Sequence, residues 1–202
     1  MKAARIRWFL IVLLSGAAHL TPAQLLDRLA LDSVKTYRDL EKAMREPDKV
    51  YRLDLSGQKL RELPPEVLQL KHLNALDLGR NRLKELPEGF GELVYMQELI
   101  LHRNKFRSVP QGICSMRRLK RLDLSRNVIE GLPACMGALK ELVSLDLWSN
   151  ELNEVPEEVA GMGSLRFLDL RLIQFNEDEM EHISSLFPQA KIEFSAPCNC
   201  GY

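Results

Sequence analysis

Histidine and aromatic residues are scarce in this 202-residue chain, and the residues that usually perform catalysis are not grouped. Outside the first 23 residues, which are considered separately below, the histidines are His72, His102 and His182, and they fall in three different parts of the sequence. Catalytic and metal sites need several such groups at a defined spacing, and no phosphate-binding glycine loop, paired histidine motif or nucleophile motif is present. We therefore expect a protein that is not an enzyme and that uses no cofactor.

The chain also lacks an excess of charge of either sign. It has 28 Lys and Arg residues and 28 Asp and Glu residues. Without residues 1–23, which carry Lys2, Arg5 and Arg7, the balance becomes 25 − 28 = −3. Nucleic acids and anionic membrane surfaces attract basic proteins, so this mildly acidic balance argues against both as partners.

Long apolar runs are absent except near the N-terminus. The basic stretch "MKAARIR" precedes the apolar run "WFLIVLL", and small residues follow up to Ala23. This order is typical of a secretory signal peptide. A retained membrane anchor is the alternative, but a spanning helix needs about 20 apolar residues, and Ser15 and Gly16 interrupt this run. We expect residues 1–23 to be removed after Ala23. The protein would then be secreted, periplasmic or in the cell envelope, without membrane insertion.

The remaining sequence is dominated by one repeated motif. The stretch "LDLGRNRLKELP" at residues 76–87 returns as "LDLSRNVIEGLP", and in looser form as "LILHRNKFRSVP". A 23-residue step from Leu53 and from Leu55 meets leucine in six successive copies, and a fixed period of this length indicates a stacked repeat architecture. Residues at the same position of successive copies form columns. Two are leucine columns: Leu53, Leu76, Leu99, Leu122, Leu145 and Leu168; and Leu55, Leu78, Leu101, Leu124, Leu147 and Leu170. A third is an asparagine column, Asn81, Asn104, Asn127 and Asn150, which Gln58 and Ile173 interrupt at its two ends.

Residues 50–175 resemble about six leucine-rich repeats of the form LxxLxLxxNxLxxLPxxhxxLxx, where h is apolar. The resemblance implies an α/β solenoid, a right-handed coil with a parallel β-sheet on its concave face. The residues themselves agree, because alternating leucines predict a short half-buried strand that stacking must bury. The Asn amide can donate to and accept from backbone groups inside the turn, and the proline keeps the outer side extended. The repeat pattern resembles that of exported bacterial repeat proteins, and also that of cytosolic eukaryotic ones.

Both ends of the array have the pattern of a cap. Residues 24–49 predict an N-terminal helical cap in which Thr36 begins a helix and Asp39 completes a capping box. Residues 176–194 predict a C-terminal cap with a helix after Asn176, with Glu179 in its first turn, followed by the strand "KIEF". We expect residues 24–35 to be flexible, together with the tail at 195–202.

Side chains between the buried leucines should face solvent on the sheet. One outward column contains aspartate at five of six positions, with Ile100 as the exception, and aspartate is common at this position of such repeats. A second column stacks Arg80, Arg103 and Arg126. These arginines form either a solvated ladder or a strip that binds carboxylates and other anions.

We expect the concave face to bind a protein or peptide partner to a monomeric chain, with Trp148, Phe167 and Leu172 as anchors. In the alternative, the C-terminal cap or tail covers these three residues. A structural or adhesive component of the cell envelope is a second hypothesis for the function, and a binder of glycans or small ligands is a third. The predicted partner-binding residues are Ile100, His102, Arg103, Arg121, Asp123, Arg126, Asp146, Trp148, Phe167, Arg171 and Leu172.

Four cysteines remain to be assigned. Cys114 and Cys135 fall on the outer side of consecutive coils, and one coil spacing is compatible with a disulfide. Their 21-residue separation, two short of the repeat period, disfavours the bond, and the alternative is that both are small packing residues. Cys198 and Cys200 are close enough to be paired, to remain free or to share a metal ion, and an incidental tail is the alternative.

Overall fold

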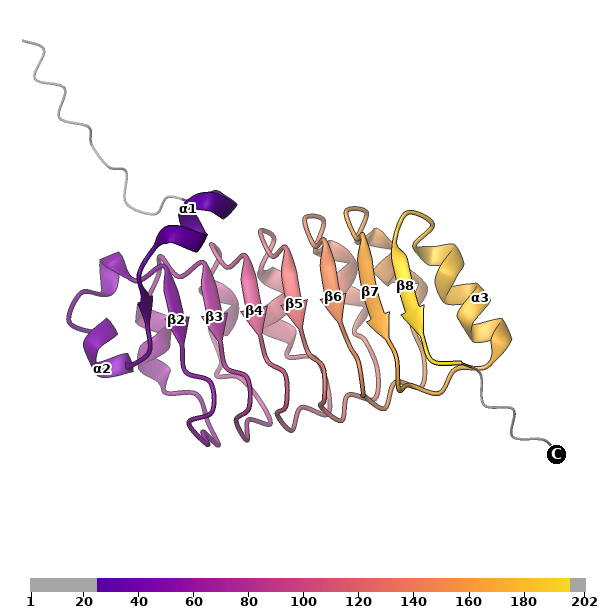
Figure 1. The fold of residues 1–202 in the computed structure, drawn as a ribbon, viewed down its shortest axis with the longest axis horizontal. Coiled ribbons are helices and arrows are strands. Elements are labelled where there is room, and N and C mark those ends of the chain that lie inside the picture. Colours follow the sequence, from indigo (N-terminus) through magenta and orange to yellow (C-terminus); the bar gives the residue numbers. More distant parts are fainter. Residues whose placement is uncertain (1–24, 197–202) are drawn as a thin grey trace, which may run out of the picture.

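The computed structural model describes residues 25–196 as a single row of stacked coils (Figure 1). Eight parallel strands form one open sheet in sequence order, and the pairing of Leu53 with Leu76 repeats with a 23-residue offset up to β7. The predicted repeat solenoid with a parallel sheet is confirmed. The sheet has two strands more than the six predicted repeats. The strands are β1 (Thr36–Tyr37), β2 (Arg52–Asp54), β3 (Ala75–Asp77), β4 (Glu98–Ile100), β5 (Arg121–Asp123), β6 (Ser144–Asp146), β7 (Phe167–Leu170) and β8 (Lys191–Phe194).

Short 3₁₀ helices form the opposite, convex side of the coils (Figure 1). Prolines such as Pro64 and Pro110 stand immediately before these helices, where the missing N–H and fixed φ are tolerated. The sequence predicted an extended or turn-like outer side in place of a long helix, and the structure forms short 3₁₀ helices there. The helices are η1 (Pro47–Lys49), η2 (Pro65–Gln69), η3 (Phe90–Glu92), η4 (Gln111–Ser115), η5 (Ala134–Ala138) and η6 (Glu157–Gly161).

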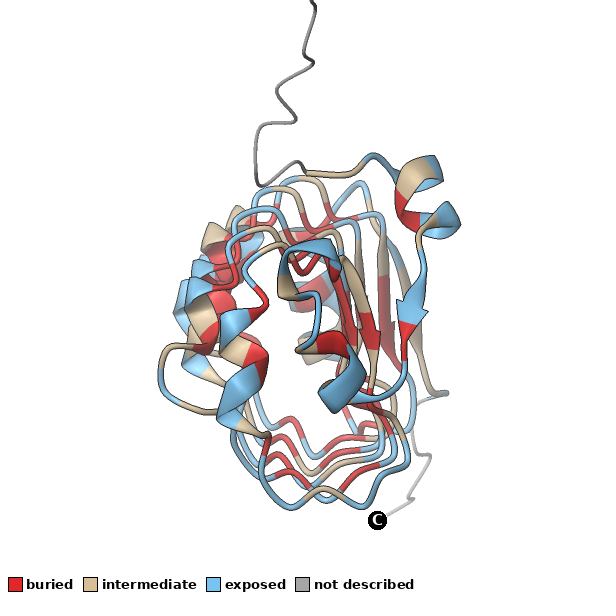
Figure 2. Ribbon diagram, turned by 90° about the vertical axis from the view of Figure 1, so that its left-hand side faces the viewer, coloured by how far each residue is buried: buried red, intermediate tan, exposed pale blue. Residues whose placement is uncertain are grey.

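The space inside the coils is filled by the leucine columns, which appear as buried stripes on successive coils in Figure 2. Leu76, Leu99 and Leu122 are fully buried or nearly so, and the convex helices add Val67, Ile113 and other apolar side chains. Complete burial of one leucine contributes about 2 kcal/mol. Each coil buries its leucines only against the next coil, so the repeats stabilise one another.

The asparagine column closes the turns after the strands. Asn81 Nδ2 donates to the carbonyl oxygens of Leu55 and Leu78, both at 2.9 Å, and its Oδ1 accepts from the Leu60 N–H at 3.0 Å. The same three contacts recur at Asn127. The predicted dual role of this amide, as donor and acceptor to buried backbone, is confirmed.

The C-terminal end follows the sequence prediction closely. Helix α3 (Glu177–Leu186) begins at a capping box in which Asn176 Oδ1 accepts from the Glu179 N–H and Glu179 accepts from the Asn176 N–H. Ile183 and Phe187 are buried against the last coil, and β8 extends the sheet. Helix and strand together cover one open end of the core (Figure 1).

The N-terminal end differs from the prediction. Thr36 does not begin a helix, because it belongs to β1 and pairs with Arg52. Asp39 is the N-cap of the short helix α2 (Leu40–Ala43) instead, with its Oδ1 accepting from the Lys42 N–H at 3.0 Å. The edge of β2 offers unpaired backbone groups, and this long-range pairing overrides the local helix signal.

Residues 25–35, expected to be flexible, also take a defined position. They include helix α1 (Arg28–Ser33), which lies on the side of the coils away from the 3₁₀ helices (Figure 2). The Leu26 N–H donates to Asn74 Oδ1 at 3.1 Å, and its carbonyl oxygen accepts from Gln97 Nε2 at 2.6 Å. The expectations for residues 1–23 and for Cys198 and Cys200 lie outside the described residues.

A disulfide joins Cys114 in η4 to Cys135 in η5, with Cα atoms 5.6 Å apart. The 21-residue separation was expected to disfavour the bond. On the convex face, however, residues of one coil contact residues 21 positions later in the next coil. Gly91 and Gly112 have the same separation, and a Cβ added to Gly91 would lie 2.8 Å from the Gly112 carbonyl oxygen. The 3₁₀ helices therefore face one another with an offset of two residues, and the cysteines occupy equivalent positions one coil later.

Candidate binding site on the sheet face

The repeat register sorts the residues on the side of the sheet opposite the leucine core into rows that run across the strands. We name four rows from the start of the strands to the turn after them. The strand-start row contains Arg52, Ala75, Glu98, Arg121, Ser144, Phe167 and Lys191; the Asp row contains Asp54, Asp77, Ile100, Asp123, Asp146 and Asp169; the Trp row contains Ser56, Gly79, His102, Ser125, Trp148 and Arg171; the left-handed row contains Gly57, Arg80, Arg103, Arg126, Ser149 and Leu172.

The Asp row stabilises the ends of the strands. Asp123 Oδ1 accepts from the Ser125 N–H at 3.0 Å, and Asp146 Oδ1 accepts from the Trp148 N–H at 3.0 Å. Burial raises the pKa of Asp146, although the hydrogen bond from the Trp148 N–H opposes this effect. Asp123 and Asp146 were predicted to bind a partner, yet each commits one carboxylate oxygen to its own turn.

Ile100 interrupts the Asp row, and His102 fills the neighbouring space. Nδ1 of His102 lies 3.4 Å from Asp123 Oδ2. Its ring also lies against Gly79, where an added Cβ would be 2.7 Å from the imidazole Cε1. His102 is therefore held by packing and by a carboxylate, while Ile100 remains partly exposed on the face.

The left-handed row is conformationally strained. Arg80, Arg103 and Arg126 have φ values of 56°, 52° and 54°, and Leu172 has 58°. A left-handed backbone costs a residue with a Cβ about 1–2 kcal/mol. Each of these three arginines is exposed, and among residues 25–196 none of them has a carboxylate oxygen within ion-pair distance. We call these three residues the Arg strip.

An exposed cluster lies where the Trp row and the left-handed row approach the C-terminal end. The guanidinium carbon of Arg126 is 4.3 Å from the ring centroid of Trp148. Trp148, Arg171, Leu172 and Ser195 line a shallow hollow beside this pair. Leu172 is 62% exposed, and its N–H donates to Ser195 Oγ at 2.7 Å. The segment after β8 thus binds the Leu172 backbone and leaves its side chain open.

Two other predicted residues do not join this cluster. Phe167 and Arg121 belong to the strand-start row, and both register with Ser144, four residues before Trp148. At a rise of 3.3 Å per residue, this separates Phe167 from Trp148 by about 13 Å along the strands. Phe167 and Trp148 therefore mark opposite edges of the face.

Arg171 is already engaged within the protein. Its Nε donates to Asp169 Oδ1 at 3.0 Å, its Nη2 also contacts this buried carboxylate, and these bonds raise the pKa of Arg171. The sequence pattern did not predict Ser195. Ser195 was expected to lie in a flexible tail, but β8 pairs with β7 at an offset of 24 residues, and this register brings Ser195 to the Leu172 backbone.

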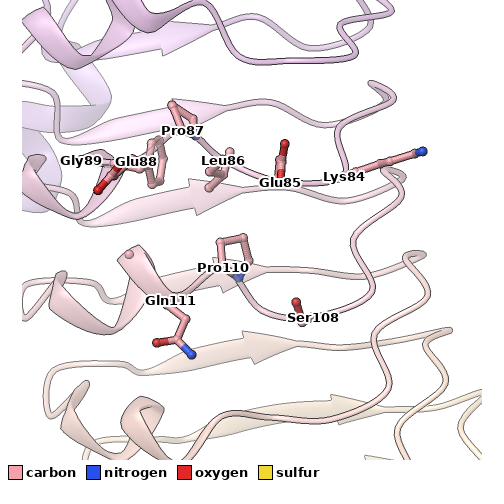
Figure 3. Close-up of a pocket in the computed structure, with 11 residues that line it drawn as sticks. Lys84, Glu85, Leu86, Pro87, Glu88, Gly89, Ser108, Pro110 and Gln111 are labelled. Carbon is pink, nitrogen blue, oxygen red and sulfur yellow. The ribbon is translucent and has the colours of Figure 1, made fainter.

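A second hollow, of 370 Å³, lies on the convex side between the coils of β3 and β4 (Figure 3). Its walls come from the turns around Pro87 and Pro110, and Lys84 extends away from both prolines. In the part of the chain that the structure describes, no group of three or more His, Cys, Asp and Glu residues could hold a metal ion. No helix between residues 25 and 196 is long and apolar enough to cross a membrane.

Solved structures with the same fold include two bacterial proteins. An internalin (InlF) of Listeria monocytogenes is 22% identical, with a TM-score of 0.58 over 72% of this chain and 40% of that chain. Internalin C2 of the same species is 18% identical, with a TM-score of 0.59 over 73% of this chain and 62% of that chain. The chain therefore spans less than two thirds of the length of either protein. These similarities show the fold.

Comparison with functionally curated proteins finds no match. The leucine-rich repeat family model matches residues 48–106 and 94–152, which together cover more than half of the sequence. The matched region contains β2 to β6 and the asparagine column. The chain belongs to the leucine-rich repeat family.

Proposed function

We propose that this chain is an exported binding module, not an enzyme, whose concave face binds a protein or peptide partner. The observation that carries the proposal is the open cluster of Arg126, Trp148 and Leu172. Arg126 and Leu172 are exposed and Trp148 is half-buried, so the fold leaves part of this surface open to a partner. Trp and Arg are the residues that most often dominate binding energy at interfaces.

The rigidity of the sheet supports this role. The side chains of the cluster follow the ends of β5, β6 and β7, whose backbones are hydrogen-bonded to neighbours on both sides. A surface held in this way loses little conformational entropy when a partner binds. The segment with α1 contacts Asn74 and Gln97, which lie just before β3 and β4 begin. The partner would therefore contact the opposite edge of the face, where the strands end.

Export of a bacterial protein is the second part of the proposal. The basic, apolar and small-residue order of residues 1–23 supports secretion. A disulfide between Cys114 and Cys135 is stable in the periplasm or outside the cell and is rare in a reducing cytosol. We propose that the exported chain acts as a monomer.

The test is crosslinking and recovery of partners from the native compartment with wild-type protein and Trp148→Ala. The expected result is loss of the recovered partner with Trp148→Ala. Val94→Ala is the matched control, because Val94 is an exposed apolar residue outside all four rows. Equal recovery with Trp148→Ala and wild type, in a folded protein, contradicts binding at this cluster.

A further inference from the structure

We infer that the partner presents an acidic segment, whose carboxylates bind the Arg strip while an adjacent apolar side chain packs on Trp148 and Leu172. This inference rests on the proposed function and adds the chemistry of the partner to it. The Arg strip consists of Arg80, Arg103 and Arg126, which occupy the same position in three consecutive coils.

The sheet face carries both signs of charge, and internal pairing decides which sign is available. Most of the Asp row is already paired or desolvated. Asp54 lies 3.4 Å from Arg38, Asp123 lies 3.4 Å from His102, and Asp169 is bound by Arg171. Asp77 and Asp146 are half-buried, and each accepts a backbone N–H of its own turn, from Gly79 and from Trp148.

The Arg strip shows the opposite condition. None of its three guanidinium groups has a carboxylate oxygen within ion-pair distance among the described residues, and each side chain is exposed. The left-handed backbone belongs to the turn itself, because Ser149 and Leu172 also adopt it at this position. What distinguishes the Arg strip is three exposed guanidinium groups in register without a carboxylate partner among the described residues, which an external anion can bind.

The geometry of Arg126 fits a carboxylate and an apolar group together. Stacking on the indole uses the face of the guanidinium and leaves the N–H groups at its edge free to donate. Arg171 illustrates the expected contact, because its N–H groups bind both oxygens of Asp169. With a carboxylate at Arg126, the hollow lined by Trp148 and Leu172 is left for an apolar side chain on the same face of the partner.

The spacing favours an extended peptide. Neighbouring strands lie about 4.8 Å apart, so the strip spans about 10 Å from Arg80 to Arg126. Alternate side chains of an extended chain lie about 6.6 Å apart on one face. Two or three acidic side chains of one short segment can therefore reach the strip.

The test uses short random peptides displayed on phage and selected against the full chain at low salt, with single-stranded DNA as a parallel probe. We expect enrichment of peptides that combine Asp or Glu with an aromatic or aliphatic residue. The inference is wrong if basic or uncharged peptides are enriched, or if no peptide is enriched. It is also wrong if the Arg strip is needed for binding of DNA but not for binding of any peptide.

Enriched peptides are then titrated against Arg103→Gln, Trp148→Ala and the control Arg61→Gln, an exposed arginine outside the four rows. Arg103→Gln should weaken binding about tenfold, and Arg61→Gln should leave it unchanged. If Trp148→Ala abolishes binding and Arg103→Gln does not, the proposed function stands and the inference of an acidic partner is wrong. Insensitivity to both variants overturns both proposals.

Discussion

The guanidinium of Arg126 stacks on the indole of Trp148 across two consecutive coils, with 4.3 Å between the guanidinium carbon and the ring centroid. A cation–π contact at an exposed position contributes about 0.5–1 kcal/mol. This contact places one of the three arginines of the Arg strip against the tryptophan that lines a hollow together with Leu172. The contact links the charged and apolar parts of the site.

Arg126→Ala should change the fluorescence of Trp148 and lower the free energy of unfolding by no more than about 1 kcal/mol. The change is small because both side chains remain accessible to water without the contact. Fluorescence emission and urea denaturation measure the two effects, with Arg61→Ala as the control. A loss of stability as large as that of a core substitution would show that the pair is structural.

Leu172→Asn should stabilise the protein by up to about 1 kcal/mol relative to Leu172→Ala, because asparagine tolerates a left-handed backbone better than alanine. The bond from the Leu172 N–H to Ser195 is retained in both variants. Thermal unfolding compares them. If alanine is as stable as asparagine at this position, backbone strain does not limit stability there.

Asn127→Ala should lower the free energy of unfolding by about 2–4 kcal/mol, because it leaves the buried carbonyl oxygens of Leu101 and Leu124 and the Phe106 N–H without their partner. Asn153→Ala is the control, because Asn153 is exposed and outside the column. Urea denaturation should separate the two variants clearly, and equal midpoints would contradict the role of the column.

Reduction should destabilise the array by about 3 kcal/mol, because the bond between Cys114 and Cys135 closes a loop across a separation of 21 residues. The double variant Cys114→Ser and Cys135→Ser should unfold at the same denaturant concentration with or without reductant. Intact mass of the wild type, with and without reductant, counts the bonds. Identical wild-type midpoints under both conditions, with the bond present, would show that it adds no stability.

Asp146→Asn should stabilise the protein near neutral pH. Burial raises the pKa of Asp146 above its ordinary value of 3.8 in the folded state, so the folded state holds its proton more strongly than the unfolded chain does. The contribution of Asp146 to the free energy of unfolding is therefore fully present below the ordinary pKa of an aspartate. This contribution is lost as the pH rises through the raised pKa of the folded state.

The amide carbonyl that Asp146→Asn introduces can still accept from the Trp148 N–H, so the turn is preserved. Denaturation curves between about pH 3 and pH 7 measure the effect, with Glu154→Gln as an exposed control that removes the same charge. As the pH rises, the stability of the variant should fall less than that of the wild type. An unchanged pH dependence would contradict a desolvated Asp146.

The sequence by itself determined the coil. Leu76 and its equivalents recur with a 23-residue period, and a period of that length with apolar alternation has one solution that buries every copy. The roles of Asn81 and Asn127 also followed from local chemistry, since a buried turn needs a side chain that both donates and accepts. The capping box of α3 was predictable for the same reason, because all of its partners lie within three residues.

The tertiary structure decided whatever depends on contacts between coils. Thr36 pairs with Arg52 because the sheet offers an open edge, and Cys135 meets Cys114 because convex helices face one another with a two-residue offset. Phe167 and Trp148 are both outward-facing, but the direction of the strands places them at opposite edges. Local periodicity fixes which side chains point outward; which of them meet, and which arginines lack a partner, depends on the packing of one coil against the next.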